Sequence, residues 1–273
     1  MPFVWWPLKW NVIAFVQRTM AAVLVGAADI IYASTAAWIP RLQRLGRGAR
    51  RIEPLAIPSN VPSTASSERV AAARRRMGAD AELVVGHFGT YGSLITTLLT
   101  PLIDRLSRDR PTLRFALLGR GSAAYRRTLI ESHPDRESSI AAFDDLMPAD
   151  VTAYIQAADV MLQPFPDGAS FRRTSLMACL AAAAPTITTV GALSEPIWQS
   201  QAICPAAHVG DVEAVVALFR RLSAEPDARR LLGRQAAAYY ERHFSLERTI
   251  DVLLGRPTQP PAAAPQGSRD VAP

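Results

Sequence analysis

The feature that most constrains this chain is a regular alternation of short β-prone runs and helical segments, which begins at Ala81. We expect strands over Leu83–Phe88, Leu113–Leu118, Ser139–Phe143, Asp159–Gln163, Thr186–Thr189 and Ala202–Pro205. We expect helices over Ser93–Leu106, from near Ser122, and over Pro148–Ala157, Phe171–Ala184, Val212–Leu222, Pro226–His243 and Leu246–Leu254. Parallel neighbours need a long return path, which such helices provide. The alternation therefore predicts an α/β fold with a doubly wound, mostly parallel sheet.

Residues before Ala81 predict a second, smaller α/β unit. In order they read as a strand over Asp29–Ala33, a helix over Ala36–Leu45, an apolar run over Ile52–Ile57, a Pro- and Ser-rich linker, and an Arg-rich helix over Val70–Met77. We therefore divide the chain into residues 1–60, a linker helix over 61–80, a ligand-binding domain over 81–255 and a tail over 256–273. The tail is rich in Pro, Ala and Gly and has too little apolar surface to fold.

The composition is that of a globular protein, with 49% hydrophobic and 20% charged residues. The net charge of +6 comes almost wholly from arginine, because Lys9 is the sole lysine. The arginines are scattered instead of clustered with aromatic residues, which disfavours nucleic-acid binding. Cys179 and Cys204 lack the spacing of a zinc site or a disulfide framework, and this favours a reducing, cytoplasmic location.

The N-terminal region is apolar, but its pattern is interrupted. Gln17 and Arg18 break the run, so neither a signal peptide nor a transmembrane helix is expected. A buried or interface helix is the favoured interpretation. The tryptophans Trp5, Trp6 and Trp10, beside Lys9, also fit a membrane surface, so peripheral membrane association stays open.

Ligands of doubly wound sheets bind outside the carboxyl ends of the strands, where the strand order reverses. The first loop at such an end is Gly86–Gly92, whose glycines allow close approach and which leads into a helix N-terminus. A tight strand-to-helix turn without a ligand explains it equally well. The second loop, Gly119–Ser122, is a weaker signal, because such turns are common in α/β folds.

The third loop is Pro164–Ser170, which leads into Phe171–Ser175. We expect the helix to begin at Ser170, with Arg172 and Arg173 in its first turn, where their charge opposes the helix dipole. A bound diphosphate would reverse that penalty, since arginine binds phosphate through a fork of donors. The alternative is structural, with one arginine facing solvent and the other paired with Asp167 or Glu195. The predicted diphosphate-binding residues are Gly89, Thr90, Gly168, Ala169, Ser170, Arg172 and Arg173.

The order of these landmarks resembles the Rossmann-like C-terminal domain of GT-B glycosyltransferases, especially the retaining group with sucrose and mannosyl transferases. The resemblance lies in GHFGTYG, LRFALLGRGS, DVTAYIQAADVMLQPFPDG, SFRRTSLMACLAAAAPTITT and LSEPIW, between Leu83 and Leu254. It implies a nucleotide-sugar donor, with the diphosphate at the Ser170 helix and the base near Phe143–Leu146. Further candidate donor contacts are Arg120, Phe143, Asp167, Thr174 and Glu195.

Residues 1–60 resemble only the end of the N-terminal, acceptor-binding domain of that family and the linker after it, so a truncated acceptor domain is expected. The chain also departs from the family pattern at two glutamates eight positions apart, which Ser170 and Ala178 replace. The usual Arg and Lys of the first loop are missing as well. Arg172 and Arg173 would then supply the positive charge.

The leading interpretation is transfer of a sugar from a nucleotide-sugar to an unknown acceptor, in glycan or polysaccharide synthesis. No cofactor and no metal ion are expected, since there is no Asp-x-Asp motif. Two alternatives remain, a nucleotide-binding module without catalysis and a partner subunit. The histidines are expected at surface or packing positions, and they are His87, His133, His208 and His243.

Overall fold

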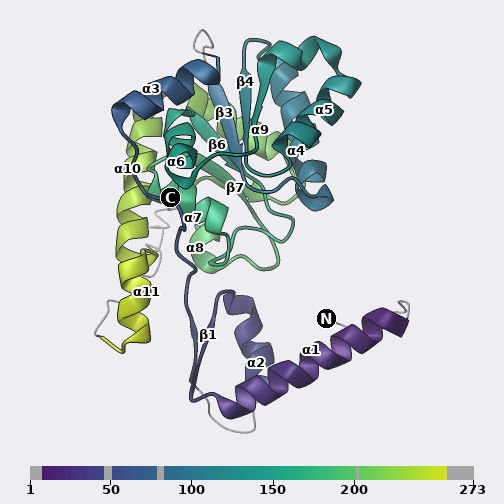
Figure 1. Cartoon of the computed structure of the whole chain (residues 1–273), viewed down its shortest axis with the longest axis vertical. Coiled ribbons are helices and arrows are strands. Elements are labelled where there is room, and N and C mark those ends of the chain that lie inside the picture. The colour runs from purple at the N-terminus through teal and green to yellow at the C-terminus, as the bar shows by residue number, and fades with distance from the viewer. Residues whose placement is uncertain (1–7, 46–50, 79–82, 201–202, 257–273) are drawn as a thin grey trace, which may run out of the picture. The chain divides into compact units, whose positions relative to one another are not determined.

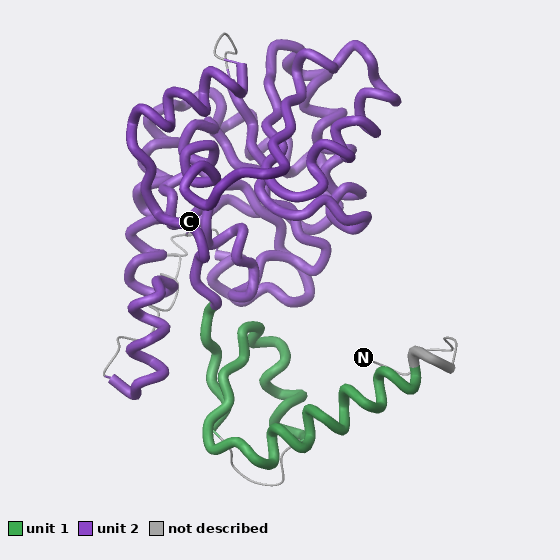
Figure 2. Tube along the Cα trace, viewed as in Figure 1, with its two compact units in different colours: residues 1–56 green, residues 57–273 purple. Residues whose placement is uncertain are grey.

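The computed structural model describes residues 8–45, 51–78, 83–200 and 203–256. The chain forms two compact units, unit 1 with residues 1–56 and unit 2 with residues 57–273 (Figure 2). Each unit is described by itself. The expected tail over 257–273 and the first tryptophans, Trp5 and Trp6, lie outside the described residues.

Unit 2 is built on a parallel sheet (Figure 1). Its described residues form six strands in the order β5-β4-β3-β6-β7-β8. The strands are β3 (Val84–Phe88), β4 (Arg114–Leu118), β5 (Ile140–Phe143), β6 (Val160–Gln163), β7 (Thr186–Val190) and β8 (Ala206–His208). From β3 the chain proceeds outward to β4 and β5, then returns to β6 on the other side of β3. This arrangement confirms the doubly wound parallel sheet, and the strand order reverses between β3 and β6.

Helices cover both faces of this sheet. The described helices of unit 2 are α3 (Ser67–Arg76), α4 (Ser93–Asp109), α5 (Ser122–Ser132), α6 (Pro148–Ala157), α7 (Thr174–Ala181), α8 (Pro196–Gln199), α9 (Val212–Ala224), α10 (Pro226–His243) and α11 (Leu246–Leu253), with a 3-10 turn over Pro134–Ser139. Side chains of successive strand residues point to opposite faces. Val85 accordingly packs in the cluster with α4 and α9, whereas Val84 packs in the cluster with α3, α6 and α7. Two separate apolar cores result, one on each face.

The last strand does not lie where the sequence predicted it. The run over Ala202–Pro205 was the expected strand, whereas β8 spans Ala206–His208 and Ala202 lies outside the described residues. Pro205 has no amide hydrogen to donate to a neighbouring strand, although its carbonyl accepts from Thr188 N at 3.0 Å. Regular pairing with β7 therefore begins at the next residue, where Ala206 is the partner of Thr188.

Unit 1 contains α1 (Leu8–Ala27), β1 (Ile30–Ala33), a 3-10 turn over Ala36–Trp38, α2 (Ile39–Leu45) and β2 (Arg51–Pro54). Its two described strands pair in parallel, with Ile30 opposite Arg51. One side of α1 is exposed, with Phe15 and Leu24 at 64% and 66%, whereas Val25 is 4% exposed, so the interpretation as a buried or interface helix stays a prediction. Among the described residues, no helix combines the length and the hydropathy needed to cross a bilayer.

Candidate functional site

The candidate site lies at the carboxyl ends of β3 and β6, the point where the strand order reverses. Two loops border this point, residues 89–92 after β3 and residues 164–173 after β6. The loops lie close together, because a β-carbon placed on Gly89 would be 3.9 Å from Ser175 Oγ at the start of α7. The loop that leads into α4 therefore lies beside the start of α7, and the first amides of each helix have no acceptor within that helix.

The first loop packs closely against the loop after β4, which contains Gly119. Gly89 N donates to Leu118 O at 3.0 Å, and a β-carbon on Gly119 would be only 2.4 Å from Gly89 O. Gly119 also has a φ of +105°, so both its backbone conformation and its surroundings require glycine. Thr90 is exposed at the tip of the first loop. Glycine at these positions thus serves the close approach of two loops, and it leaves the α4 N-terminus accessible.

The N-terminus of α5, after the second loop, already holds a carboxylate of the chain itself. Asp144 accepts from Ser122 Oγ and, at 2.8 Å, from Ala123 N. These hydrogen bonds lower the pKa of Asp144, and the one from the Ser122 hydroxyl has the larger effect. The Asp144 carboxylate thus occupies the place that an anion would take. Arg120, in the same loop, is exposed.

Phe143 ends β5 beside this second loop. Its ring lies 4.5 Å from the ring of Tyr154, and the guanidinium of Arg76 lies 5.5 Å from its centroid. Its carbonyl accepts from Gly119 N at 2.9 Å. Phe143 is half-buried, so one part of its ring remains available for stacking at the edge of the sheet.

The third loop corrects the predicted helix start. We expected the helix to begin at Ser170, but α7 begins at Thr174 and ends at Ala181. The backbone of Phe171 is bonded elsewhere, since its amide donates to Glu195 Oε2 at 3.2 Å and its carbonyl accepts from Ile57 N at 2.9 Å. A residue bonded on both sides to distant segments cannot take part in the helical pattern. Arg172 and Arg173 therefore precede the helix instead of forming its first turn.

Both arginines contact one carboxylate. Arg172 and Arg173 each form an ion pair with Asp167, and their side chains are 29% and 19% exposed. The guanidinium of Arg173 also lies 4.6 Å from the centroid of the Phe165 ring, and burial lowers the pKa of Arg173. The structural alternative predicted a pair with Asp167, which is confirmed, but it is wrong in placing the second arginine in solvent. Two forked cations instead lie together at the entry to α7, with Asp167 balancing part of their charge.

The remaining predicted residues of this loop are mostly engaged by the protein. The amides of Gly168 and Ala169 donate to Phe165 O at 3.1 Å and Thr189 O at 2.7 Å. Glu195 is 4% exposed and also accepts from the indole of Trp198 at 2.8 Å, so it anchors the loop. Thr174, a predicted donor contact and the first residue of α7, is exposed. Ser170, a predicted diphosphate-binding residue, is fully buried. Among the described residues, the Ser170 hydroxyl has no hydrogen-bond partner.

Beneath the two loops lies a polar cluster that the sequence analysis did not assign to the site. Gln163, at the end of β6, donates to Phe88 O at 3.1 Å and contacts Ser175 Oγ at 3.3 Å. His87 on β3 is 4% exposed, and its Cε1 lies 3.4 Å from a β-carbon placed on Gly89. Its Nδ1 has no hydrogen-bond partner among the described residues. The signal in the sequence was its position at the end of a predicted strand, directly before the glycine loop.

Burial lowers the pKa of His87 to about 3. The unfolded chain takes up this proton near pH ~6.5, so acidification below that value favours the unfolded state until the folded pKa is reached. From about pH 7 to about pH 5, we expect His87 to reduce the free energy of unfolding by about 2 kcal/mol. Urea unfolding across this range should show a flatter pH dependence for His87→Gln than for the wild type. His208→Gln, which changes an exposed histidine, should keep the wild-type dependence; equal slopes for all three proteins would contradict the assignment.

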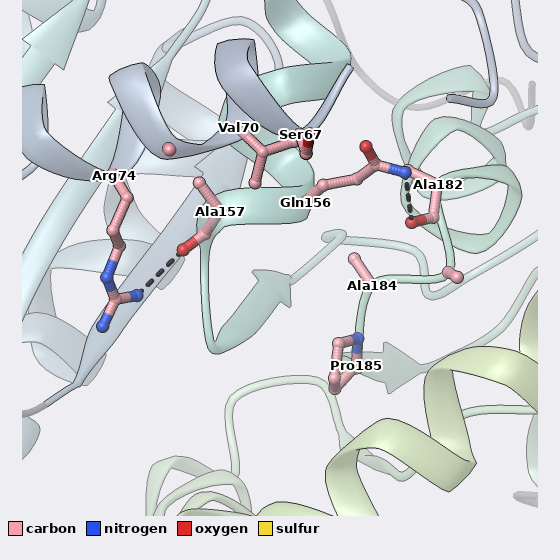
Figure 3. A pocket seen from close by; sticks show the side chains of 10 residues that line it. Ser67, Val70, Arg74, Gln156, Ala157, Ala182, Ala184 and Pro185 are labelled. Carbon is pink, nitrogen blue, oxygen red and sulfur yellow. Dashed lines mark hydrogen bonds between the residues drawn. The ribbon is translucent and has the colours of Figure 1, made fainter. Parts of the chain in front are cut away.

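A pocket of about 610 Å³ lies at the opposite edge of the sheet, where β6 and β7 begin (Figure 3). Arg74 reaches Ala157 O at 2.8 Å and forms an ion pair with Asp159, and Gln156 Nε2 donates to Ala182 O at 3.3 Å. These polar groups are engaged by the protein, and none of the predicted site residues lines this pocket. Among the described residues, no group of three or more His, Cys, Asp or Glu side chains is placed to hold a metal ion.

Comparison with known proteins gives structural matches only. No protein-family model matches the chain, and no curated protein matches it in sequence. Anabaena HepE, solved with UDP and glucose, has a TM-score of 0.66 at 15% identity, with 88% of this chain and 66% of that chain covered. Sucrose-phosphate synthase from Thermosynechococcus elongatus has a TM-score of 0.67 at 16% identity, with 88% and 60% covered.

WaaG, a glycosyltransferase involved in lipopolysaccharide biosynthesis, has a TM-score of 0.62 at 17% identity, with 83% of this chain and 62% of that chain covered. This chain thus spans between 60% and 66% of the length of these three structures. At such identities the likeness concerns the fold, and that fold extends over most of this chain.

Proposed function

We propose that this chain, whose fold is that of the GT-B glycosyltransferases, binds a nucleoside diphosphate-sugar and transfers the sugar to an acceptor. The observation that carries the proposal is the approach of the loop before α4 to the start of α7, next to Arg172 and Arg173, at the point where the strand order reverses. In this proposal, residues 81–255 form the donor-binding domain, and residues 1–60 belong to the acceptor side. HepE, a structure of similar fold, was solved with UDP and glucose.

The chemistry supports this assignment. In glycosyl transfer the bond between the sugar and the diphosphate breaks, and negative charge grows on the departing diphosphate. Helix amides and guanidiniums that are already in place stabilise such charge without reorganisation. Arg172 and Arg173 can each donate two parallel hydrogen bonds to phosphate oxygens. The proposed mechanism therefore needs no metal ion, because these two cations take its part.

In the proposal, Asp167 pairs with the two arginines until a diphosphate replaces it. Without a donor, its carboxylate balances the charge of Arg172 and Arg173. An incoming diphosphate carries more negative charge than one carboxylate and presents more acceptor oxygens, so it competes for the same guanidiniums. Since Asp167 is 28% exposed, it can turn to water when the diphosphate displaces it. The base of the nucleotide would lie near Phe143–Leu146, where the half-buried ring of Phe143 offers a stacking surface.

The test is a calorimetric titration of the purified chain with UDP, GDP and ADP. We expect saturable binding of one nucleoside diphosphate and weaker binding of the matching monophosphate, because the β-phosphate meets the α7 N-terminus. The matching nucleotide-sugars should then be screened for release of the nucleoside diphosphate in the presence of candidate acceptors. Absence of binding to all three diphosphates would contradict the donor site.

A second candidate function is binding of the nucleotide without transfer. The observation that favours it is the content of unit 1, whose described residues form two short strands, β1 and β2. Slow hydrolysis of a bound nucleotide-sugar, with no transfer to any acceptor, would support this second function and contradict the first one.

A further inference from the structure

One edge of the sheet in unit 2 is open. Among the described residues β5 ends the sheet, since its only neighbouring strand is β4. Gly119 N donates to Phe143 O at 2.9 Å, so the backbone groups of Phe143 face β4. Consecutive residues of a strand direct their backbone N–H and C=O groups to opposite sides, where they pair with neighbouring strands. The N–H and C=O groups of Ala142 therefore point away from the sheet.

The carbonyl of Ile140, two residues before Ala142, confirms this orientation. It accepts from Arg126 Nε at 2.6 Å, outside the sheet. Arg126 Nη2 also donates to Glu137 O at 3.0 Å, so this side chain braces the start of β5. Beside Ala142, on the side away from β4, the described residues place no strand. An unpaired strand edge of this kind is a template for pairing with another segment.

A groove of about 600 Å³ lies along this edge, and all of β5 lines it. The rest of the lining comes from α3, α5 and the 3-10 turn before β5. Several of the lining side chains are short, because they are those of Ala123, Ala141 and Ala142. Short side chains leave room for a further backbone beside Ala142, so the shape of the groove fits an extended segment.

The groove carries positive charge on both faces of the sheet. Arg126 and Arg127 come from α5, on the face of the cluster with α4 and α9, and Arg76 comes from α3, on the opposite face. Glu137 is the sole acidic residue among the described residues of the lining, and its carboxylate lies 3.9 Å from Arg126. Arg76 and Arg127 form no ion pair with a described residue. Three guanidiniums against one carboxylate leave an excess of two positive charges, which an anionic partner would balance.

The open edge and the charge together select an acidic segment in an extended conformation. Side chains of an added strand alternate between the two faces of the sheet. An acidic side chain on one face would meet Arg127, and the next one, on the opposite face, would meet Arg76. Main-chain hydrogen bonds to Ala142 would hold the segment in register, as in other cases of strand addition. A second copy of the chain is disfavoured, because its own β5 edge carries the same arginines and like charges repel.

We propose that the β5 edge and its three arginines bind an acidic, extended segment of a partner protein as an added strand. The proposal does not rest on the donor site, because the loops over residues 89–92 and 164–173 contribute nothing to the described lining of the groove. Phe143 lines the groove and also belongs to the proposed base position, so the test leaves Phe143 unchanged. Peptide binding and nucleotide binding are therefore separate outcomes.

Fluorescence anisotropy of the full chain with a labelled synthetic peptide tests this proposal. The peptide alternates two glutamates with one valine, which combines negative charge with a strand-forming residue. We expect saturable binding that added salt weakens, since Arg76 and Arg127 are exposed. We also expect the Ala142 amide to exchange its hydrogen at least about tenfold more slowly in the complex, because a hydrogen bond to the added strand protects it.

Charge and backbone are tested separately. Arg127→Glu should weaken binding by at least about fivefold, because it replaces an attraction by a repulsion at an exposed position. Arg234→Glu makes the same charge change at an exposed position of α10 and should bind as the wild type does. The same peptide with methylated backbone nitrogens should lose binding, since it cannot donate hydrogen bonds to the strand edge.

No binding of the acidic peptide would overturn the proposal, as would equal affinities for the wild type and Arg127→Glu. Equal affinity for the methylated peptide would also overturn it, because the contact would then be one of charge alone. Tighter binding of a single-stranded oligonucleotide, lost in Arg127→Glu, would assign the groove to nucleic acid instead. Displacement of the peptide by an equal concentration of inorganic phosphate would assign the arginines to a small anion.

Discussion

Replacing Arg173 with alanine is expected to weaken binding of the preferred nucleoside diphosphate by about tenfold to 150-fold, which corresponds to about 1.5–3 kcal/mol for hydrogen bonds to a charged group. Arg173 is the more buried of the two arginines beside Asp167, and its guanidinium lies against the ring of Phe165. In the proposed donor site, Arg173 would contact phosphate in a partly dehydrated setting, where each charged hydrogen bond contributes more than it does in water. Calorimetric titration measures the change directly.

Two further variants separate charge from geometry. Arg173→Lys keeps the charge but loses the forked donors, so we expect it to recover only part of the affinity. Arg230→Ala removes the same charge from α10, where Arg230 is 63% exposed and paired with Asp227, and it should bind as the wild type does. Equal affinities for the wild type and Arg173→Ala would exclude Arg173 from the diphosphate site. Binding of the diphosphate would then have to come from other groups than Arg173.

Gly233→Ala is expected to destabilise the packing of α10 against the rest of unit 2. A β-carbon at Gly233 would lie 2.0 Å from Ala183 O and 2.9 Å from Ala183 C, in the turn between α7 and β7. Alanine is favoured over glycine inside a helix by about 1 kcal/mol, whereas overpacking costs about 3 kcal/mol or more when backbone has to move. We expect a net loss of about 2 kcal/mol in the free energy of unfolding, and a fall of about 4–8 °C in Tm.

Thermal and urea unfolding measure this effect. Arg234→Ala is the matched control, because it adds the same residue at the next, exposed position of α10 and should change stability by less than about 0.5 kcal/mol. A higher Tm for Gly233→Ala would mean that helix propensity outweighs the contact with Ala183. That outcome would contradict the close packing of α10 on the turn between α7 and β7.

The fold of unit 2 was predictable because its cause is local. Short apolar runs and helical periodicities each involve a few neighbouring residues, and their alternation permits few topologies. The strands over Val84–Phe88 and Arg114–Leu118 lie within one residue of the predicted bounds. The strand Ala206–His208 was displaced by several residues, since its limit depends on which backbone groups of β7 are available to pair with it.

The candidate site was predictable only in its place in the chain. Glycine loops after two strands indicated where a ligand approaches, and the pair Arg172 and Arg173 indicated a site for an anion. His87 was expected at a surface or packing position, and the structure shows the packing position, since it is 4% exposed. The Ser170 hydroxyl was assigned to a helix start, and in the structure it is buried before the helix begins.

The sequence by itself determined the succession of strands and helices, the three loops at their carboxyl ends and the resemblance to a donor-binding domain. The tertiary structure alone decided where α7 begins, because Phe171 is bonded to Ile57 and Glu195, both more than twenty residues away. It also decided that Arg172 and Arg173 share Asp167. The physical reason is the same in each case: backbone hydrogen bonds and ion pairs between distant segments outweigh the weak local preferences that a sequence pattern records.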